Sequence, residues 1–226
     1  IPVHLYGQSV NMDEVTNFAK ENGLKVLEDA AQGVGVRFNG KHAGTFGEIG
    51  VLSYYGNKTI TCGEGGVILT ENDELANKVY RLKNHGRDVK GTFIHDTIGY
   101  NFSFTEMQAA VGIAQMKKLS RIIQRKKEIN EIYLKELGGM TQLKAVQIDE
   151  RTTPVFWFTS FLCEDAKNIE SFLKVHEIQS RRFFYPLHLQ PCYQNKKYIK
   201  NINDDFKISE HLYHTGISLP SSYMLT

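Results

Sequence analysis

The chain has 226 residues, of which 41% are hydrophobic and 23% are charged, and its formal net charge at pH 7 is +2. A chain of this length and composition buries a core without disulfides or structural metals, which excludes intrinsic disorder as its main state. The small net charge excludes the general phosphate attraction on which nucleic-acid binding rests, and no apolar run reaches the length of a membrane span.

The cysteine pattern indicates the cellular compartment of the protein. Cys62, Cys163 and Cys192 lie far apart and form no CxxC pair, so neither a disulfide framework nor a zinc site is expected, and the histidines show no metal-ligand spacing. A reducing cytoplasm is the expected compartment.

The chain enters an apolar stretch directly at Ile1, without a methionine, and stops at Thr226 without a closing helix. We therefore expect a chain truncated at both ends.

Helical and strand-like segments alternate in the first half, which is typical of an α/β fold with a mostly parallel sheet. The apolar spacing of residues 12–22 predicts an amphipathic helix with Asn11 as its N-cap. Short apolar runs predict strands, and further periodic segments predict helices, one of which enters through Thr105. The strands are expected at 24–27, 51–55 and 66–69, and the helices at 73–83 and 105–119.

The composition changes near Leu119, where residues 121–136 carry dense charge over a sparse apolar stripe. This pattern predicts a long exposed linking helix. Further along, a strand over 155–163, a helix over 166–176 and an aromatic segment over 183–193 indicate a smaller α+β domain. The predicted division is therefore 1–125 for a large α/β domain and 126–226 for the linking helix and the small C-terminal domain.

Polar side chains follow two of the predicted strands, at the edge where open α/β sheets keep their ligand sites. Asp29 and Gln32 come after the first strand, and Lys58 follows the second, with Ser53 shortly before it. Taken singly, an aspartate at a strand end caps a helix and a loop lysine is a solvated charge. Together they match what pyridoxal phosphate chemistry needs: an amine that bonds to the cofactor aldehyde, a carboxylate beside the pyridine nitrogen and a hydroxyl for the phosphate.

The sequence resembles the DegT/DnrJ/EryC1/StrS sugar aminotransferases, a group within the fold-type I pyridoxal phosphate enzymes. The resemblance runs from residue 3 to residue 220. The segments that carry it, in family order, are VHLYGQ, EDAAQGVG, GTFGEIG, SYYGNKTITCGEGG, GYNFSFTEMQAAVGIAQ and RFFYPLHLQPCY. The spelling YGNKTIT followed by GEGG looks most like the perosamine-synthase branch, which aminates GDP-4-keto-6-deoxymannose on the way to lipopolysaccharide O-antigen.

The resemblance implies a role for each matching residue. Lys58 is the lysine that bonds covalently to the cofactor and moves the proton during transfer. Asp29 pairs with the pyridine nitrogen and Gln32 with the ring hydroxyl. Ser53 contacts the cofactor phosphate, and Asn101 reaches the phosphate held by a neighbouring subunit. A homodimer with shared active sites follows from that last role.

The resemblance also implies the two reaction partners, glutamate and a nucleotide-linked sugar. Arg181, Tyr185 and His188 resemble the family's substrate-side loop, although a structural role fits these residues equally well. Ser103 stands where the family usually has arginine. The family's early glycine- and threonine-rich phosphate segment lies upstream of VHLYGQ and is not in this chain.

Two other functions remain open on the sequence. One is a deoxysugar dehydratase of the same family, against which Lys58 argues because those relatives carry histidine at that position. The other is a catalytically silent paralogue that acts as a scaffold subunit. The remaining candidates have structural interpretations: His4 is a core or site-lining histidine, Cys62 fills space, and Trp157 belongs to the core or a domain interface.

Overall fold

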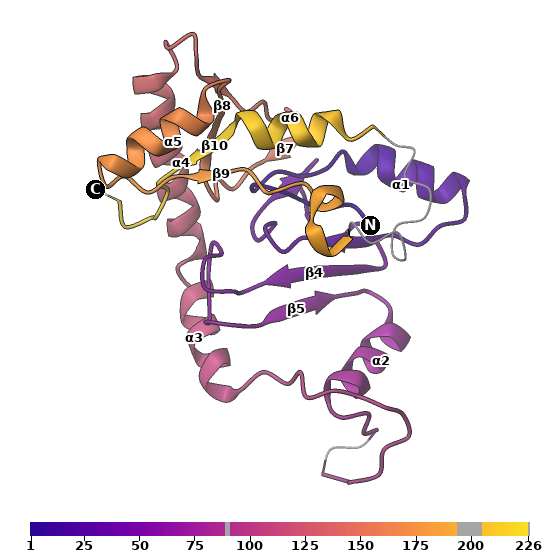
Figure 1. Ribbon diagram of the computed structural model, residues 1–226. Helices are drawn as coiled ribbons and strands as arrows, with labels where there is room; N and C mark the ends of the chain where they lie inside the picture. Colours follow the sequence, from indigo (N-terminus) through magenta and orange to yellow (C-terminus); the bar gives the residue numbers. More distant parts are fainter. Residues whose placement is uncertain (89–90, 194–204, 226) are drawn as a thin grey trace. The chain divides into compact units, whose positions relative to one another are not determined.

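The computed structural model describes residues 1–88, 91–193 and 205–225 (Figure 1). Its contacts form two compact units. The first is Ile1–Arg125 with Ile148–Trp157, and the second is Lys126–Gln147 with Phe158–Thr226. The predicted two-domain division stays a prediction, and residues 148–157 pack with the first unit instead of with the residues after 125.

The first unit combines helices with two small sheets. Its helices are α1 (Met12–Glu21), α2 (Asp73–Lys83), α3 (Glu106–Met116) and the first turns of α4 (Leu119–Leu137). Its strands are β1 (Leu27–Asp29), β2 (Arg37–Phe38), β3 (Lys41–His42), β4 (Ile49–Ser53), β5 (Gly66–Leu69) and β7 (Thr152–Thr153).

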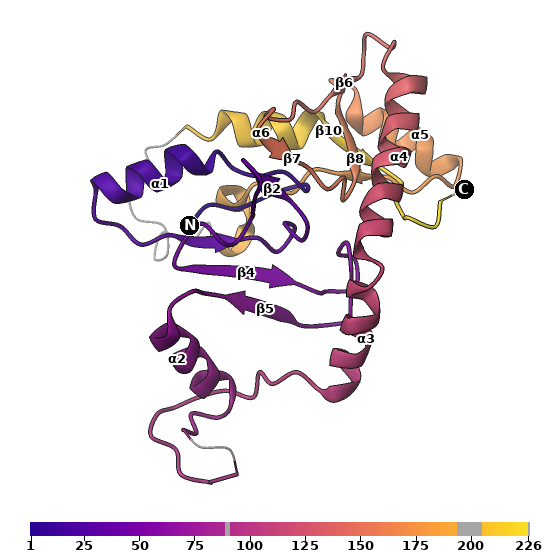
Figure 2. The same ribbon diagram turned by 180° about the vertical axis from the view of Figure 1, so that it is seen from behind.

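The sheet that carries the candidate site has the order β1-β4-β5. β1 runs parallel to β4. β5 lies antiparallel beside β4 (Figure 1, Figure 2). Val3 forms one further parallel bridge, to Asp29. The expected mostly parallel sheet is therefore mixed in the described residues, with parallel pairing at β1. The second sheet, β3-β2-β7, is antiparallel.

Local signals set the helix starts that the sequence predicts. The Asn11 side chain accepts a hydrogen bond from the Glu14 N–H at the start of α1, as expected of an N-cap. Thr105 and Gln108 form a reciprocal capping box at the start of α3. Both predicted helix starts are thus confirmed.

The predicted strand over 24–27 is wrong by three residues, since β1 begins at Leu27. The predicted strand over 51–55 likewise belongs at Ile49–Ser53. The reason is pairing: Leu27 lies opposite Ile49 and Asp29 opposite Val51, so the two strands share one register that neither reveals alone.

The core of the first unit lies directly behind the carboxyl ends of β1 and β4. Its fully buried side chains include Ala30, Val36, Ile60, Ile122 and Val155. Ala30 comes immediately after β1 and belongs to this core, so the core supports the neighbouring site residues Asp29 and Gln32.

The second unit is built on one antiparallel sheet of order β6-β8-β10-β9. Its core includes Phe161, Ala166 and Ile217. Within the predicted strand 155–163, only the last part is strand. The elements are β6 (Lys144–Ala145), β8 (Thr159–Leu162), α5 (Ala166–Val175), β9 (Arg181–Arg182), the 3-10 turns η1 (Leu187–Leu189) and η2 (Pro191–Tyr193), α6 (Lys207–Thr215), β10 (Gly216–Leu219) and the rest of α4.

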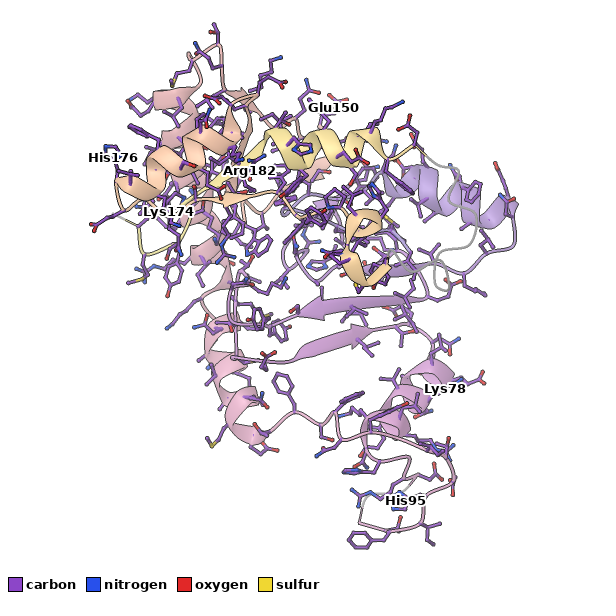
Figure 3. The ribbon with its side chains drawn as sticks, in the orientation of Figure 1. Lys78, His95, Glu150, Lys174, His176 and Arg182 are labelled. Atoms are coloured by element: carbon purple, nitrogen blue, oxygen red, sulfur yellow. The ribbon has the colours of Figure 1, made fainter. Side chains whose placement is uncertain are left out.

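The linking helix α4 is less exposed than predicted. Lys126 is buried within the second unit, and its Nζ donates a hydrogen bond to the Ser221 carbonyl at 2.8 Å. In the same unit, the guanidinium of Arg182 donates to the Tyr213 carbonyl at the end of α6 (Figure 3). No helix in the described ranges is both long and apolar enough to cross a membrane.

Candidate functional site

The turn after β4 presents Lys58. The Lys58 N–H donates to the Tyr55 carbonyl at 3.0 Å, which closes the turn. The Tyr54 N–H donates to the Gly65 carbonyl, and the Tyr54 carbonyl accepts from the Cys62 N–H. These bonds tie the loop between β4 and β5 to itself, so the backbone that carries Lys58 is ordered.

The amine of Lys58 lies in a partly buried, polar setting. Its Nζ is 4.9 Å from the centre of the Trp157 ring. Burial lowers the pKa of Lys58, while the nearby carboxylate of Asp29 opposes that change. A lysine whose pKa is lowered is better able to act as a nucleophile and as a base.

Asp29 is held at the end of β1 by its backbone. Its N–H donates to the Pro2 carbonyl and its carbonyl accepts from the His4 N–H, both at 2.9 Å. Its Oδ1 accepts from the Ala31 N–H at 3.0 Å. Within the described ranges no donor reaches Oδ2, which leaves one carboxylate oxygen as an acceptor.

Gln32 is oriented by the chain segment before α1. Its Oε1 accepts a hydrogen bond from the Tyr6 N–H at 2.7 Å. Since the amide oxygen is used in this way, the Nε2 group is the donor that remains for a ligand. The ring of Tyr6 lies 6.5 Å from the ring of Trp157, so Gln32 and Lys58 are linked through the residue Tyr6 and the side chain of Trp157.

The structure does not bring the remaining two cofactor candidates to Lys58 by any described contact. The hydroxyl of Ser53, the last residue of β4, accepts from the Tyr55 N–H at 3.2 Å. Asn101 is exposed and forms an isolated bridge with Asn84.

The three substrate-side candidates belong to the second unit, and each has a partner there. Arg181 lies over the ring of Phe158, at 5.7 Å. The ring of Tyr185 packs edge-on to that of Tyr213, at 5.1 Å. His188 Nε2 lies 2.8 Å from Glu210 Oε1, and its ring stacks on Phe206. These contacts fit the structural role that the sequence leaves open for these residues.

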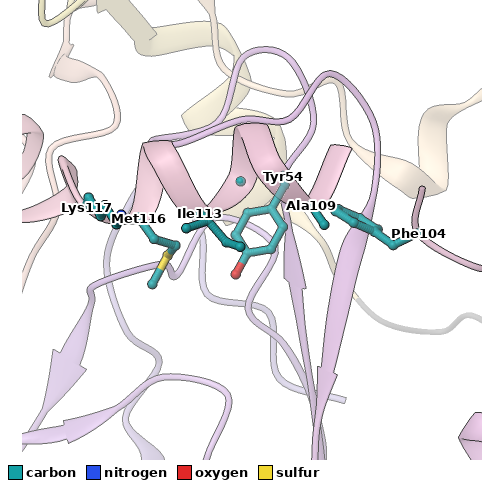
Figure 4. A pocket seen from close by; sticks show the side chains of 7 residues that line it. Tyr54, Phe104, Ala109, Ile113, Met116 and Lys117 are labelled. Atoms are coloured by element: carbon teal, nitrogen blue, oxygen red, sulfur yellow. The ribbon is translucent and has the colours of Figure 1, made fainter. Parts of the chain in front are cut away.

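An apolar groove of about 500 Å³ lies along α3, next to the turn that follows β4 (Figure 4). α3 itself has no buried residue, and its Ile113 is 59% exposed. The side chains in the groove come from Tyr54, Phe104, Ala109, Ile113, Met116 and Lys117, with Gly112 between them.

Two contacts of this region are not predicted from the sequence. Trp157, the only tryptophan, is expected in a core or an interface, yet it contacts Lys58. His4 and Glu28 form a fully buried pair beside Asp29. Neither signal is visible in a linear pattern, because each pair is distant along the chain.

The donor set at the ends of β1 and β4 fits pyridoxal phosphate. It offers a partly buried amine at Lys58, a carboxylate oxygen that no donor in the described part of the chain reaches at Asp29, and an amide donor at Gln32. These are the groups that the cofactor's aldehyde, pyridine nitrogen and ring hydroxyl require. The described residues contain no cluster of three or more His, Cys, Asp or Glu side chains that could hold a metal ion.

Comparison with known proteins identifies relatives over the whole chain. The family model of the DegT/DnrJ/EryC1/StrS aminotransferases matches residues 1–226. The chain is 38% identical over 222 residues to GDP-perosamine synthase of Escherichia coli O157:H7, and 36% identical over 224 residues to that of Vibrio cholerae. These matches cover 97% of this chain but only 59% and 60% of the relatives, so the chain spans about three-fifths of their length.

The fold agrees with solved structures of the same group. The structure of S. venezuelae DesV in complex with a ketimine intermediate superposes with a TM-score of 0.90 at 29% identity, covering 99% of this chain and 60% of that one. An aminotransferase of this group from Brucella abortus matches with a TM-score of 0.89 at 27% identity, covering 99% and 59%. The chain belongs to the DegT/DnrJ/EryC1/StrS aminotransferase family.

Proposed function

We propose that the chain forms the lysine-bearing part of a pyridoxal phosphate-dependent aminotransferase that moves an amino group from glutamate to the keto carbon of a nucleotide-linked deoxy sugar. The observation that carries this proposal is the placement of Asp29 at the end of β1 and of Lys58 in the loop after β4, its parallel neighbour, with Asp29 near enough to oppose the lowering of the Lys58 pKa. When bound, the cofactor supplies an electron-withdrawing ring that stabilises negative charge on the reacting carbon.

Each residue then has a defined task. Lys58 Nζ would hold the cofactor covalently and would move the proton at the reacting carbon, and burial lowers the pKa of this amine. Asp29 Oδ2 would hold the pyridine nitrogen protonated, and Gln32 Nε2 would donate to the ring hydroxyl. Ser53 and the Asn101 of a second copy hold the phosphate.

The proposed sugar substrate is GDP-4-keto-6-deoxymannose, in the synthesis of a perosamine-containing surface polysaccharide such as lipopolysaccharide O-antigen. Two relatives that share 36% and 38% identity are both named GDP-perosamine synthase, which supports this choice. Arg181, Tyr185 and His188 are the proposed substrate contacts. Free thiols at the described cysteines and a nucleotide-linked substrate support a cytoplasmic reaction.

The proposed architecture is a fold-type I enzyme with a large cofactor-binding α/β domain at 1–125 and a small α+β domain at 126–226. The parallel β1–β4 pair and the antiparallel sheet of the second unit support the two halves of this proposal.

A homodimer is also proposed. The apolar, unburied surface of α3 and the groove along it support a protein partner, since contiguous exposed apolar area of this kind marks interaction sites. Sedimentation velocity of Ile113→Asp tests the dimer, with Ile208→Asp on α6 as a control of similar exposure. A shift to monomer in the first variant alone is expected. Two variants that both sediment like the wild type would contradict the proposed interface.

The reaction is tested by incubating the protein with pyridoxal phosphate, glutamate and GDP-4-keto-6-deoxymannose and following the sugar by mass spectrometry. The proposal predicts an amino sugar in the wild type and none with Lys58→Ala. A deoxygenated keto sugar without an amino group would instead indicate a dehydratase. No change in the sugar, with no cofactor bound, would indicate a scaffold subunit.

A further inference from the structure

Trp157 contacts both Lys58 and the residue before it. Its indole Nε1–H donates to the carbonyl of Asn57, the residue before Lys58, at 2.7 Å. The face of its ring lies 4.9 Å from Lys58 Nζ. One side chain, only 4% exposed, thus holds the peptide that leads into Lys58 and lies against the amine itself.

Trp157 is itself held by a close backbone contact. The Val155 N–H donates to the Gly7 carbonyl at 2.9 Å. At Gly7, which has a φ of +74°, a Cβ atom would lie only 1.6 Å from the Val155 carbonyl oxygen. Because only glycine permits this approach, the backbone of residues 155–157 packs closely against the segment that contains Tyr6.

Tyr6, on this same segment, connects Trp157 to the rest of the site. Tyr6 packs near Trp157 through its ring and orients Gln32 through its N–H. Tyr6 and Trp157 therefore connect the amide of Gln32 with the amine of Lys58. A misplacement of a reacting group by about 1 Å can lower a rate by about a hundredfold.

The ring also affects the charge of the amine. The face of an indole attracts a cation, so Trp157 favours the protonated form of Lys58, as Asp29 does, against the effect of burial. Removal of the ring takes away this attraction and also part of the burial of the amine, so we expect it to change the pKa of Lys58.

We propose that Trp157 is a positioning residue for Lys58, which fixes both the turn that carries the amine and the direction in which the amine points. The inference rests on the proposed function, because the position of the amine matters for catalysis only if Lys58 bonds to the cofactor. Two substitutions separate the two contacts. Trp157→Phe keeps an aromatic face and removes the N–H donor, whereas Trp157→Leu removes both.

The contact itself is tested without cofactor. Since the chain has a single tryptophan, its fluorescence reports on residue 157 alone. Emission is followed from pH 7 to 11 in the wild type, in Lys58→Met and in Lys78→Met, an exposed lysine on α2 (Figure 3). We expect a transition below pH 10.5 that is lost in Lys58→Met and kept in Lys78→Met. Identical titrations in all three proteins would overturn the inference.

The role toward the cofactor is tested with pyridoxal phosphate bound. We expect Trp157→Leu to move the pH midpoint of the visible band of the lysine-bound cofactor and to lower kcat by about ten- to hundredfold, with the KM for glutamate little changed. Trp157→Phe should keep most of the midpoint and lose part of kcat. Circular dichroism checks folding, and Trp157→Phe provides the test if Trp157→Leu does not fold.

The two possible failures are distinguishable. A normal band in the wild type, with the same midpoint and kcat in both Trp157 variants, would overturn the positioning role and leave the proposed function intact. A wild type with no band would overturn the proposed function and this inference together.

Discussion

The imidazole Nε2 of His4 lies 3.0 Å from Glu28 Oε2, and solvent reaches neither side chain. The Val10 N–H donates to the other ring nitrogen, Nδ1, at 3.3 Å. Nδ1 is therefore an acceptor, so the proton resides on Nε2 and the imidazole donates to the carboxylate. Glu28 precedes Asp29 on β1, which means that this buried pair anchors the strand that presents the aspartate.

Glu28→Gln should lower the free energy of unfolding by about 2–3 kcal/mol, because the carboxylate also accepts from the N–H groups of Gly44, Phe46 and Gly47 at 2.6 to 2.7 Å. The glutamine side chain has one NH₂ group in place of a carboxylate oxygen. This NH₂ group cannot accept a hydrogen bond, so at least one of the backbone N–H groups is left without an acceptor. Urea unfolding measures the change. Glu21→Gln, at an exposed position, is the control and should change stability by less than about 0.5 kcal/mol.

The same carboxylate predicts how stability depends on pH. Burial raises the pKa of Glu28, but the hydrogen bonds from His4 and from the three backbone N–H groups outweigh it, so the pKa lies below 4.5. A carboxyl whose pKa is lowered by folding stabilises the protein above its unfolded pKa and loses this effect as the pH falls through its folded pKa. The stability difference between wild type and Glu28→Gln should therefore be constant from pH 7 to about 5 and shrink below 4.5. A difference that is still constant at pH 3.5 would contradict this explanation.

Lys126 predicts a change of the same sense at high pH, where stability again rises as the pH rises. Burial lowers the pKa of Lys126 to about 8, from 10.5. Between these values the unfolded chain binds more protons than the folded one, so stability rises with pH in that range. Urea unfolding between pH 7 and 10 should show this rise in the wild type relative to Lys126→Met. Parallel curves for the two proteins would show that the amine is solvated.

Asp29→Asn separates cofactor binding from chemistry. The amide cannot hold the pyridine nitrogen protonated by opposite charge, so glutamate-dependent loss of the visible band should slow by about a hundredfold or more. The band itself should persist, since Lys58 is unchanged. Stopped-flow absorbance measures the rate, and Asp73→Asn at the exposed start of α2 is the control. An unaltered rate in Asp29→Asn would remove the aspartate from the mechanism.

The sequence predicted the elements whose signals are local. Asn11 and Thr105 mark the starts of α1 and α3, because a capping residue is satisfied by the backbone a few positions later. β1 was misplaced because its register depends on Ile49 and on Val3, which lie far along the chain. The register of a strand is set by the neighbouring strand with which it pairs, and the sequence of one segment does not identify that neighbour.

The candidate site divides in the same way. Lys58, Asp29 and Gln32 are predictable because each belongs to a recognisable strand end or motif, and in the structure the carboxylate of Asp29 acts on the pKa of Lys58. The contact of Trp157 with Asn57 joins residues about a hundred positions apart, through a segment that rejoins the first unit after leaving it. Such contacts depend on how distant segments pack, and the spacing of apolar residues along the sequence does not indicate them.

The role of Lys58 is the central claim, and covalent trapping tests it most directly. The protein is mixed with pyridoxal phosphate, reduced with borohydride, digested and mapped by peptide mass spectrometry. The account predicts a phosphopyridoxyl group on the peptide that contains Lys58, and its loss when glutamate is added before the borohydride. A label on another lysine, or no label on any peptide, would contradict it.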